Sequence, residues 1–236
     1  MNICFTFNET LVLYGNPLKN SSILAAKTKY YILMGDVVSS SEYDAKVLRS
    51  KLKALVEGCN HTMEKKTLSP YTITLGDEFQ GISKSLETAI ETFFYFEEEC
   101  LRKEIEFKLH YVLHYGEIET EINKDIAYEM MGPGLTKARK TLSSKKRERK
   151  RFEFDLSDKE LTEQLTRIFE VLDAIILSWK KEDFPLIISM IESDNNSEVG
   201  KKHGKNRDQI WKRRKNLMVN EYNLLKDFIL TYIRKT

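Results

Sequence analysis

The sequence has few cysteines and prolines and no long apolar run. Among its 236 residues are three cysteines, four prolines and ten glycines. Because Cys4, Cys59 and Cys100 are odd in number and widely spaced, they argue against both a disulfide framework and a zinc site. No stretch approaches the roughly 18 consecutive apolar residues of a membrane span, and the beginning lacks the basic start and apolar run of a secretory signal. We therefore expect a cytoplasmic protein that makes no contact with a membrane.

Charge is distributed unevenly along the chain. The formal net charge is +2, with 41% hydrophobic and 31% charged residues, an ordinary composition for a protein with a sizeable core. Residues 195–236, however, carry 11 basic and 4 acidic side chains, an excess of +7, whereas the residues before them are acidic on balance. Such asymmetry between segments indicates a nucleic-acid partner for the basic end.

The hydrophobic pattern from residue 29 onward predicts alternating strands and helices. Short apolar runs at 30–34, 71–75, 78–82 and 106–118 are typical of strands. Two segments of helical periodicity lie between them. The first runs from the serines at 39–41, which are candidate N-caps, to about residue 64, and the second covers residues 83–101. The order β-α-β-β-α-β predicts a ferredoxin-like sheet in which the first and third strands are neighbours.

An all-helical part is predicted after residue 156. Before it, the glycine-proline-glycine segment at 132–134 opens a short helix to about Leu142, and residues 152–156 form a last strand. From residue 157 the pattern is helical, with a break at Phe184-Pro185, a helix at 186–192 and a polar turn at 193–197. We therefore expect an α+β protein. Its parts are an N-terminal extension at 1–28, a βαββαβ domain at 29–156 and a helical domain at 157–236.

Glycine-aspartate pairs at 35–36 and 76–77 occupy matching places, one at the end of the first strand and one in the turn before the third. Neighbouring strands lie about 4.8 Å apart, so the carboxylates come close, and like charges at 4 Å repel by about 4 kcal/mol at an effective dielectric near 20. A divalent cation relieves that repulsion, because Mg²⁺ is typically held by one or two carboxylates, waters and substrate phosphates. The alternative is simple turn chemistry. The candidate ligands of a Mg or Mn ion are Asp36 and Asp77, then the Val37 carbonyl and Glu78.

Four segments resemble the catalytic palm of class III nucleotide cyclases and diguanylate cyclases. Within that superfamily, the Gly-Asp-Val-Val-Ser-Ser start and the Gly-Pro-X-X-X-X-Ala-Arg segment are most similar to the SatD family. The resemblance covers about residues 30–142, and its SatD part continues into the C-terminal helices. It implies a nucleotide-cyclase-like palm domain at 29–156, Mg or Mn as cofactor and a nucleoside triphosphate as partner. The four segments lie at 34–40, 75–79, 113–117 and 132–139.

The resemblance also implies roles for single residues. In cyclases the acids at these two strand ends bind two metal ions that hold the triphosphate, which implies that role for Asp36 and Asp77. Cyclases place an Asn and, four residues on, an Arg in the helix after the glycine motif. This sequence has Thr136 and Lys140 there, with Arg139 shifted by one residue, which turns a helical side chain by about 100°. The resemblance therefore favours metal and phosphate binding over cyclisation, and we assign His114 no catalytic role. The expected catalytic residues are Arg139 and Lys140, and the expected nucleotide-binding residues are Ser39, Ser40, Gly76 and Thr136.

Residues 197–216 have the layout of a helix-turn-helix. Gly204 would form the turn and Asn206 would cap the second helix, which could then lie in the major groove of duplex DNA. The alternative is a solvated basic helical face, because His203 and Lys205 hold places that are usually apolar in this motif. The expected DNA-binding residues are Asn206, Arg207, Gln209, Lys212, Arg213 and Lys215.

Two functions remain open at this level. The first is a divalent-metal-dependent nucleotide-binding domain coupled to a DNA-binding helix-turn-helix, which together would form a nucleotide-responsive regulator. The alternative is an active nucleotidyl cyclase or nucleotidyltransferase acting on a nucleoside triphosphate, with C-terminal helices that serve protein contacts. The sequence leaves open whether the protein is an enzyme. In either case we expect a homodimer, since cyclase sites form between palms and helix-turn-helix units read paired half-sites.

Overall fold

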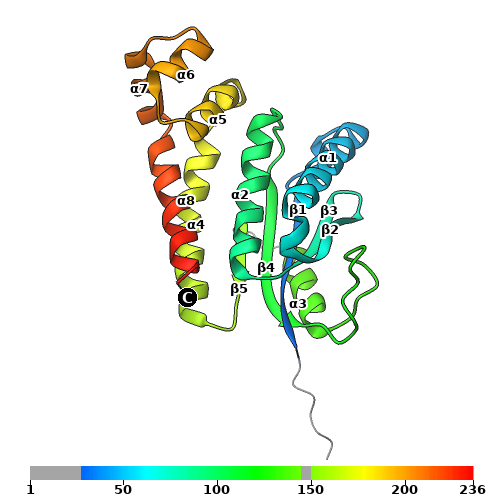
Figure 1. Ribbon diagram of the computed structural model, residues 1–236. Coiled ribbons are helices and arrows are strands. Elements are labelled where there is room, and N and C mark those ends of the chain that lie inside the picture. Colours follow the sequence, from blue (N-terminus) through cyan, green and yellow to red (C-terminus); the bar gives the residue numbers. More distant parts are fainter. Residues whose placement is uncertain (1–27, 145–149, 236) are drawn as a thin grey trace, which may run out of the picture.

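Five strands form one sheet at the centre of the computed structural model, which describes residues 28–144 and 150–235. The predicted extension at 1–28 lies outside the described residues except for its last position. The spatial order of the strands is β2-β3-β1-β4-β5 (Figure 1). β1 pairs antiparallel with β3 on one side and β4 on the other, which confirms that the first and third strands are neighbours. The strands are β1 Lys29–Val37, β2 Thr67–Leu75, β3 Glu78–Ser83, β4 Leu109–Glu117 and β5 Phe152–Asp155.

Eight α-helices surround and extend this sheet within the described residues. None of these helices is long and apolar enough to span a membrane. The mixed α+β class is therefore confirmed, and the chain after β5 contains only helices. The helices are α1 Ala45–Met63, α2 Leu86–Arg102, α3 Pro133–Leu142, α4 Lys159–Ser178, α5 Phe184–Glu192, α6 Asn196–His203, α7 Arg207–Asn216 and α8 Val219–Ile233.

Four local expectations are corrected by the structure. The N-cap of α1 is Asp44, whose carboxylate accepts two backbone N–H groups, because the serines at 39–41 belong to a left-handed residue and a separate 3-10 turn. Pro70 lies inside β2 rather than before it, and this is tolerated because β2 is an edge strand. Pro185 lies in the first turn of α5, where its missing N–H costs nothing. Finally, Asn195 caps α6 within the segment expected to be a turn.

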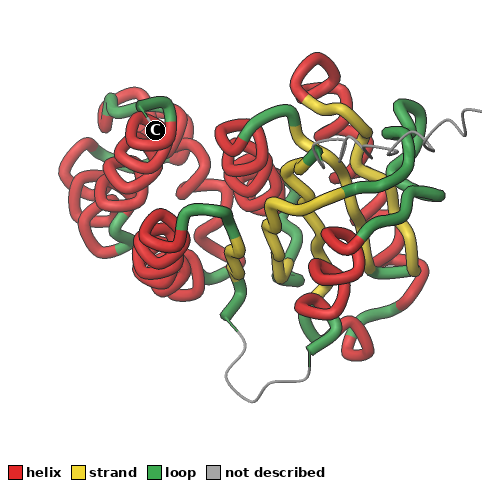
Figure 2. Tube along the Cα trace, turned by 90° about the horizontal axis from the view of Figure 1, so that it is seen from below, coloured by secondary structure: helices red, strands yellow, loops and turns green. Residues whose placement is uncertain are grey.

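The two faces of the sheet are covered by different helices because side chains alternate along each strand. Leu33, Phe79 and Tyr111 belong to a large buried cluster with α1 and α2. Ile32, Met34 and Val112 instead form a smaller cluster with Leu135, Ala138 and Leu142 of α3. Figure 2 shows the remaining helices gathered on one side of the molecule, beside α2 and next to β5. The edge of the sheet that carries β5 is therefore the junction between the strands and the C-terminal helices.

The C-terminal helices share one continuous core with the sheet. Phe169 of α4 packs on Phe93 and Phe94 of α2, and Tyr222 of α8 packs on Phe94. The boundary predicted after residue 156 thus coincides with the end of β5, but the buried apolar cluster continues across it. Whether residues 29–156 and 157–236 behave as separate domains stays a prediction.

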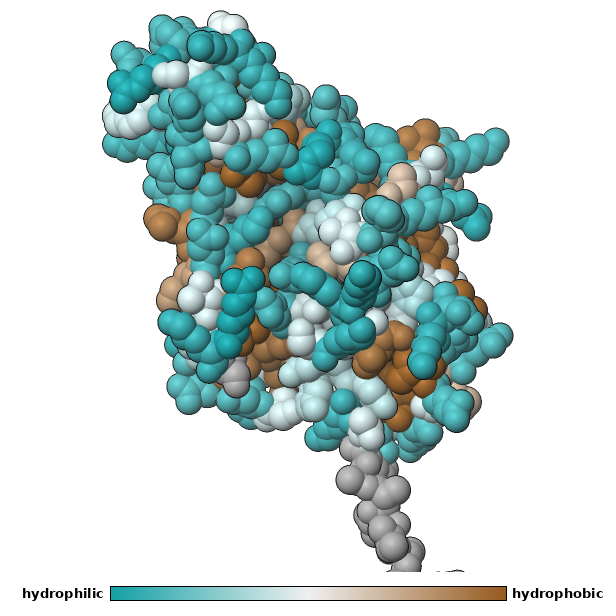
Figure 3. Space-filling view, in the orientation of Figure 1, coloured by the Kyte–Doolittle hydropathy of each residue, from teal (hydrophilic) through white to brown (hydrophobic). Residues whose placement is uncertain are grey.

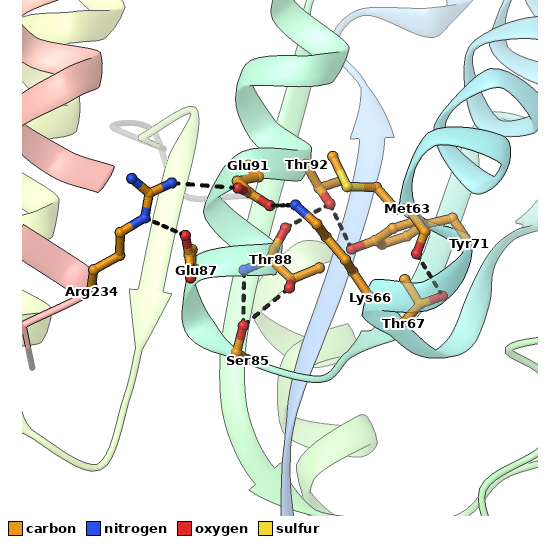
Figure 4. Close-up of polar contacts among 10 residues, drawn as sticks. All are labelled: Met63, Lys66, Thr67, Tyr71, Ser85, Glu87, Thr88, Glu91, Thr92 and Arg234. Atoms are coloured by element: carbon orange, nitrogen blue, oxygen red, sulfur yellow. Dashed lines mark hydrogen bonds and ion pairs between the residues drawn. The ribbon is translucent and has the colours of Figure 1, made fainter. Parts of the chain in front are cut away.

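Ion pairs at the surface fix the end of α8 on α2. Arg234 Nε lies 2.5 Å from Glu87 Oε1, and one guanidinium nitrogen lies 4.0 Å from Glu91. Glu91 also takes a contact of 2.7 Å from Lys66, which precedes β2 (Figure 4). The next residue of α2, Thr92, bonds the buried hydroxyl of Tyr71 at 3.0 Å. A single helix therefore connects the last helix of the chain to the edge of the sheet.

We expect Gly134→Ala to lower the free energy of unfolding by about 1–3 kcal/mol. A Cβ at Gly134 would lie 2.7 Å from the carbonyl carbon of Gly116 and from the Glu117 carbonyl oxygen, which are backbone atoms that cannot rotate away. For a chain of this size the melting temperature should fall by roughly 2–4 °C for each kcal/mol. Gly76→Ala is the matched control, because its Cβ meets nothing within 4 Å. Equal melting temperatures for the two variants would contradict the close packing of α3 on β4.

Candidate functional site

A cavity of about 610 Å³ opens where β1 ends, between the sheet and α4. It is lined by side chains from five separate stretches: the end of β1, the β2–β3 turn, the starts of β4 and β5, and α4. The lining is of mixed charge, with acids on several sides and basic groups between them. Its charged and histidine residues are Asp36, Asp77, Lys108, His110, Lys150, Arg151, Glu170 and Asp173.

The two predicted metal-binding aspartates are brought to this same cavity. The Val37 backbone N–H donates to the Asp77 carbonyl at 3.1 Å, so the end of β1 is joined directly to the turn that carries Asp77. Val37, Ser39 and Ser40 also line the cavity. Ser39 has the left-handed backbone conformation, with φ 52°. This conformation is unfavourable for a residue with a side chain, and here it lies where the chain leaves β1.

Glu78 does not line this cavity. It is opposite Asp36 in the β1–β3 register, and its carboxylate accepts from Arg139 of α3 at 3.3 Å. Arg139 also donates to Gln80 at 3.1 Å. Glu78 and Gly76 line neither this cavity nor the second one described below. The structure therefore brings five of the predicted residues to one cavity, namely Asp36, Val37, Asp77, Ser39 and Ser40, whereas the Glu78 carboxylate is held by Arg139.

Arg139, Lys140 and Thr136 line a different cavity of about 700 Å³, on the α3 face of the sheet. Its walls include Met34, Gln80 and the loop that leads to α3, where Tyr128 and Met131 are exposed. Thr136 Oγ1 donates back to the Gly132 carbonyl at 3.2 Å, as helical threonines often do. Within one chain, the residues expected to be catalytic and those expected to hold metal therefore lie in separate cavities.

His110 lies beside Asp36 and was not expected from the sequence. Its ring is buried, with Nδ1 3.1 Å from Asp36 Oδ1 and Nε2 3.1 Å from Glu153 Oε1. Each ring nitrogen thus lies within hydrogen-bond distance of one carboxylate oxygen. This row of three side chains crosses β1, β4 and β5. Its sequence signal is weak, because only the strand register places His110 opposite Asp36.

Arg151 is the second unexpected residue. It is the last residue of the basic run at 145–151. A charged run between a helix and a strand is usually exposed to solvent, yet the side chain of Arg151 is buried. Its guanidinium donates to Glu97 of α2 at 2.7 Å, to Asp173 of α4 at 2.6 Å and to the Leu109 carbonyl at 3.2 Å. Burial alone would lower the pKa of Arg151, but Glu97 and Asp173 outweigh it and raise the pKa. Among the described residues, the remaining nitrogen, Nη2, has no hydrogen-bond partner.

The predicted helix-turn-helix segment contains two short helices, α6 and α7, joined at Gly204 in the left-handed conformation. A Cβ on Gly200 would lie 2.4 Å from the Lys205 carbonyl, so only glycine fits where the turn crosses α6. Asn206 and Gln209 bond each other's backbone N–H groups in a capping box, which gives both a structural role. Arg213 forms an ion pair with Asp183. Arg207, Lys212 and Lys215 are exposed, as are Lys201, Lys202 and Lys205.

His114 lies on β4, four residues beyond His110, and contacts Asp155 and the α3 side of the sheet. Its Nδ1 is 2.8 Å from Asp155 Oδ2, in a geometry that does not make a hydrogen bond. Burial lowers the pKa of His114 from its usual 6.5, while Asp155 opposes this shift and Lys137 adds to it. His114 lines neither of the two cavities, in keeping with a structural role.

We expect the free energy of unfolding to fall as the pH is lowered below about 6.5, because the unfolded chain takes up a proton that the buried His114 ring resists. Urea midpoints at pH 7 and pH 5 measure this difference, and His114→Gln should reduce it. The pKa of His203 is also lowered, chiefly by burial. His203→Gln is therefore the matched control, because it removes the contribution of His203 to the pH dependence and leaves that of His114. Parallel pH profiles for the natural protein and His114→Gln would contradict the assignment.

Taken together, these features define an α+β protein with four acids and several cations around one cavity between its sheet and α4. The SatD family model matches residues 30–220, and the chain belongs to that family. No curated protein matches the chain.

Two solved structures are similar to part of the chain. One is the catalytic core of a rhodopsin-guanylyl cyclase with converted specificity in complex with ATPalphaS, 14% identical over 52% of this chain and 77% of that chain, with a TM-score of 0.30. The other is the monomeric guanylyl cyclase domain of the RhoGC fusion protein from the aquatic fungus Blastocladiella emersonii. It is 12% identical over 51% of this chain and 79% of that chain, with a TM-score of 0.31.

Proposed function

We propose that the first cavity binds a divalent metal ion together with the phosphates of a nucleoside triphosphate, and that the protein is a nucleotide-responsive regulator. The observation that carries this proposal is that Asp36 and Asp77, from separate parts of the chain, line one cavity together with Lys108 and Arg151. Carboxylates attract the metal, and the cations attract phosphate oxygens. A metal-phosphate ligand satisfies both sets of charges at once.

The residues of the first cavity suit a metal ion that binds together with the phosphates of a nucleotide. Within residues 28–144 and 150–235, no three His, Cys, Asp or Glu side chains form a cluster able to hold a metal. Asp36 and Asp77 would supply the carboxylates, with the Val37 carbonyl as a further candidate, and Mg²⁺ or Mn²⁺ would complete its shell with water and phosphate oxygens. The bound ion would neutralise phosphate charge. Arg151 Nη2, which lacks a hydrogen-bond partner within the part of the chain that the structure describes, is suited to donate to an anionic oxygen after a small shift.

A nucleotide-responsive role is favoured over the alternative, an active cyclase or nucleotidyltransferase. Such an enzyme needs a cation at the reacting phosphate. Arg139 and Lys140 line the second cavity, and Arg139 is already held by Glu78 and Gln80. In a homodimer of palms, a partner could bring these cations to the aspartates, and so the enzyme remains the second candidate. Cyclic nucleotide or pyrophosphate release from a triphosphate would establish it.

We expect Mn²⁺ with a nucleoside triphosphate to raise the melting temperature of the protein by roughly 5–10 °C when the ligand is at about 100 times its Kd, since the ligand binds only the folded chain. Asp36→Asn and Asp77→Asn should each reduce that rise strongly, because each removes one of two carboxylates. The measurement is thermal unfolding with and without Mn²⁺, for each triphosphate in turn.

Asp208→Asn is the matched control for this test. It removes the same charge from the exposed first turn of α7, and the rise in melting temperature should persist. An equal rise in the Asp36→Asn/Asp77→Asn double variant, or no rise in the natural protein, would contradict the proposal.

A second candidate activity is binding of duplex DNA by α7. The observation that favours it is the exposed cluster of cations on α6, α7 and the turn between them, at the end of the molecule farthest from the α3 face (Figure 1). Arg207 begins α7, and Lys212 and Lys215 follow on the same short helix. Helices of this kind contact base edges through their first turn and phosphates through later cations. DNA binding at this end would connect nucleotide binding to transcription.

We expect the affinity for duplex DNA to fall steeply with salt, and Lys212→Ala to reduce the slope of log K against log salt by roughly one unit. Fluorescence anisotropy with labelled duplexes measures this. Lys212 is preferable to Arg213, because the ion pair between Arg213 and Asp183 would be lost as well. Lys53→Ala, an exposed lysine on α1, should leave the slope unchanged. Absence of binding at low salt would rule this activity out.

A further inference from the structure

Exposed apolar side chains gather on the outer side of α8 and α4. Leu224 is 69% exposed, and Phe228 and Val171 are each 55% exposed. Figure 3 shows apolar patches on the surface of this helical layer, among the hydrophilic side chains that cover most of the view. Large apolar side chains at the surface are ordinary when single, but neighbouring ones on adjoining helices mark a contact surface.

The exposed residues of α8 follow the spacing of a helix-pairing seam. Glu221, Leu224, Phe228, Thr231 and Lys235 are all exposed and stand three, four, three and four residues apart. This is the interval at which one helix presents a continuous stripe to a partner helix. We call these five residues the α8 stripe.

The α8 stripe is left over after α8 has packed against its own chain. The opposite side of the helix buries Tyr222, Ile229 and Ile233 in the core. Lys226 and Arg234 form ion pairs with acids of α2, so the rotation of the helix about its axis is fixed. Figure 4 shows Arg234 reaching toward Glu87 and Glu91. A turn of α8 that would bury Leu224 and Phe228 within the same chain would break these contacts.

A groove of about 500 Å³ runs beside the α8 stripe, between α4 and α8. Apart from Glu221, its walls are apolar: Val171, Ala174, Ile175, Met218, Leu224 and Leu225. One turn further along α8, Phe228 stacks on Tyr232 with ring centroids 6.0 Å apart and planes at 7°. The surface thus offers an aromatic side chain at one end and an apolar groove at the other.

The charges at the two ends of the α8 stripe indicate which partner fits this surface. Glu221 lies in the first turn of α8, and Lys235 lies just past its last turn. A parallel second α8 would set acid beside acid and base beside base. An antiparallel one sets the acidic end of each helix beside the basic end of the other, and it brings each Phe228 to the groove beside the other Leu224. A surface that complements itself under a two-fold rotation fits a second copy of the same chain.

We propose that two copies of this protein associate through α8 and α4, with the α8 helices antiparallel across a two-fold axis between Leu224 and Phe228. Each copy inserts Phe228 into the groove formed by Val171, Ala174 and Leu224 of the other. Glu221 of each copy lies at the end that carries Lys235 of the other. This proposal is independent of what the first cavity binds.

The mass of the full-length protein in solution, measured by sedimentation over a range of concentrations, tests this interface. We expect a dimer for the natural chain and a monomer for Leu224→Glu and for Phe228→Glu, because each would bury two charges in an apolar contact. Val47→Glu is the matched control: Val47 is similarly exposed, at 52%, but lies on α1, so that variant should remain dimeric. Circular dichroism and melting curves identify any variant that fails to fold.

Charge reversal tests the antiparallel arrangement separately. Glu221→Lys or Lys235→Glu alone should weaken the dimer by roughly tenfold, because two-fold symmetry counts each pair of ends twice. The double variant Glu221→Lys/Lys235→Glu should restore the natural affinity. A monomer at every concentration overturns the proposal, as does a dimer that survives both apolar replacements. A double variant weaker than either single one overturns the antiparallel arrangement.

Discussion

The buried guanidinium of Arg151 is the interaction on which much of the arrangement depends. It joins Glu97 of α2, the Leu109 carbonyl of β4 and Asp173 of α4, and its plane lies over the Phe152 ring at 4.5 Å. The sheet, the helix that covers it and the first C-terminal helix therefore share one charged centre. Removing one partner from such a buried set leaves an uncompensated charge, at a cost of about 3–5 kcal/mol. The same group lines the first cavity, so a ligand there would contact the junction between the two parts of the chain.

Because Arg151 lines the first cavity and binds Asp173 of α4, a ligand in that cavity could affect the position of the C-terminal helices. An anion near Arg151 competes with Glu97 and Asp173 for the guanidinium, and Asp173 belongs to α4, which also lines the cavity through Phe169 and Leu177. Burial raises the pKa of Asp173 and Arg151 opposes that rise, so the carboxylate depends on its cation. Coupling between sites requires a ligand that interacts differently with two arrangements of the same groups. The shared side chains around Arg151 are the groups through which such a difference would act.

Much of the fold follows from sequence pattern because its signals are local. The apolar runs that end at Gly35-Asp36 and Gly76-Asp77 mark strand ends, and the periodic segments of α1, α2 and α4 mark helices. Asp36 and Asp77 could be predicted as neighbours because the order of elements places β1 next to β3.

The remaining site residues depend on register and packing, which one sequence does not reveal. His110 faces Asp36 only in the β1–β4 register that the structure shows. Arg151 stands in a basic run that gives no sign of burial, because the acids that bind it are far away in the chain, on α2 and α4. Glu78 was expected near the metal, and although it is paired with Asp36 in the β1–β3 register, its carboxylate accepts from Arg139 and does not line the cavity. The serines after Asp36 were expected to cap α1, but Asp44 competes more effectively because it directly precedes the helix.

Pro70 in β2 has a consequence for how copies of the chain meet. β2 is one edge of the sheet, and a proline there removes a backbone donor that an added strand would need. The other edge, β5, is only four residues long and lies against the C-terminal helices. Both borders of the sheet are thus poor templates for strand addition. A chain built in this way resists aggregation through its strands, which leaves helical surfaces and cavity rims for specific contacts.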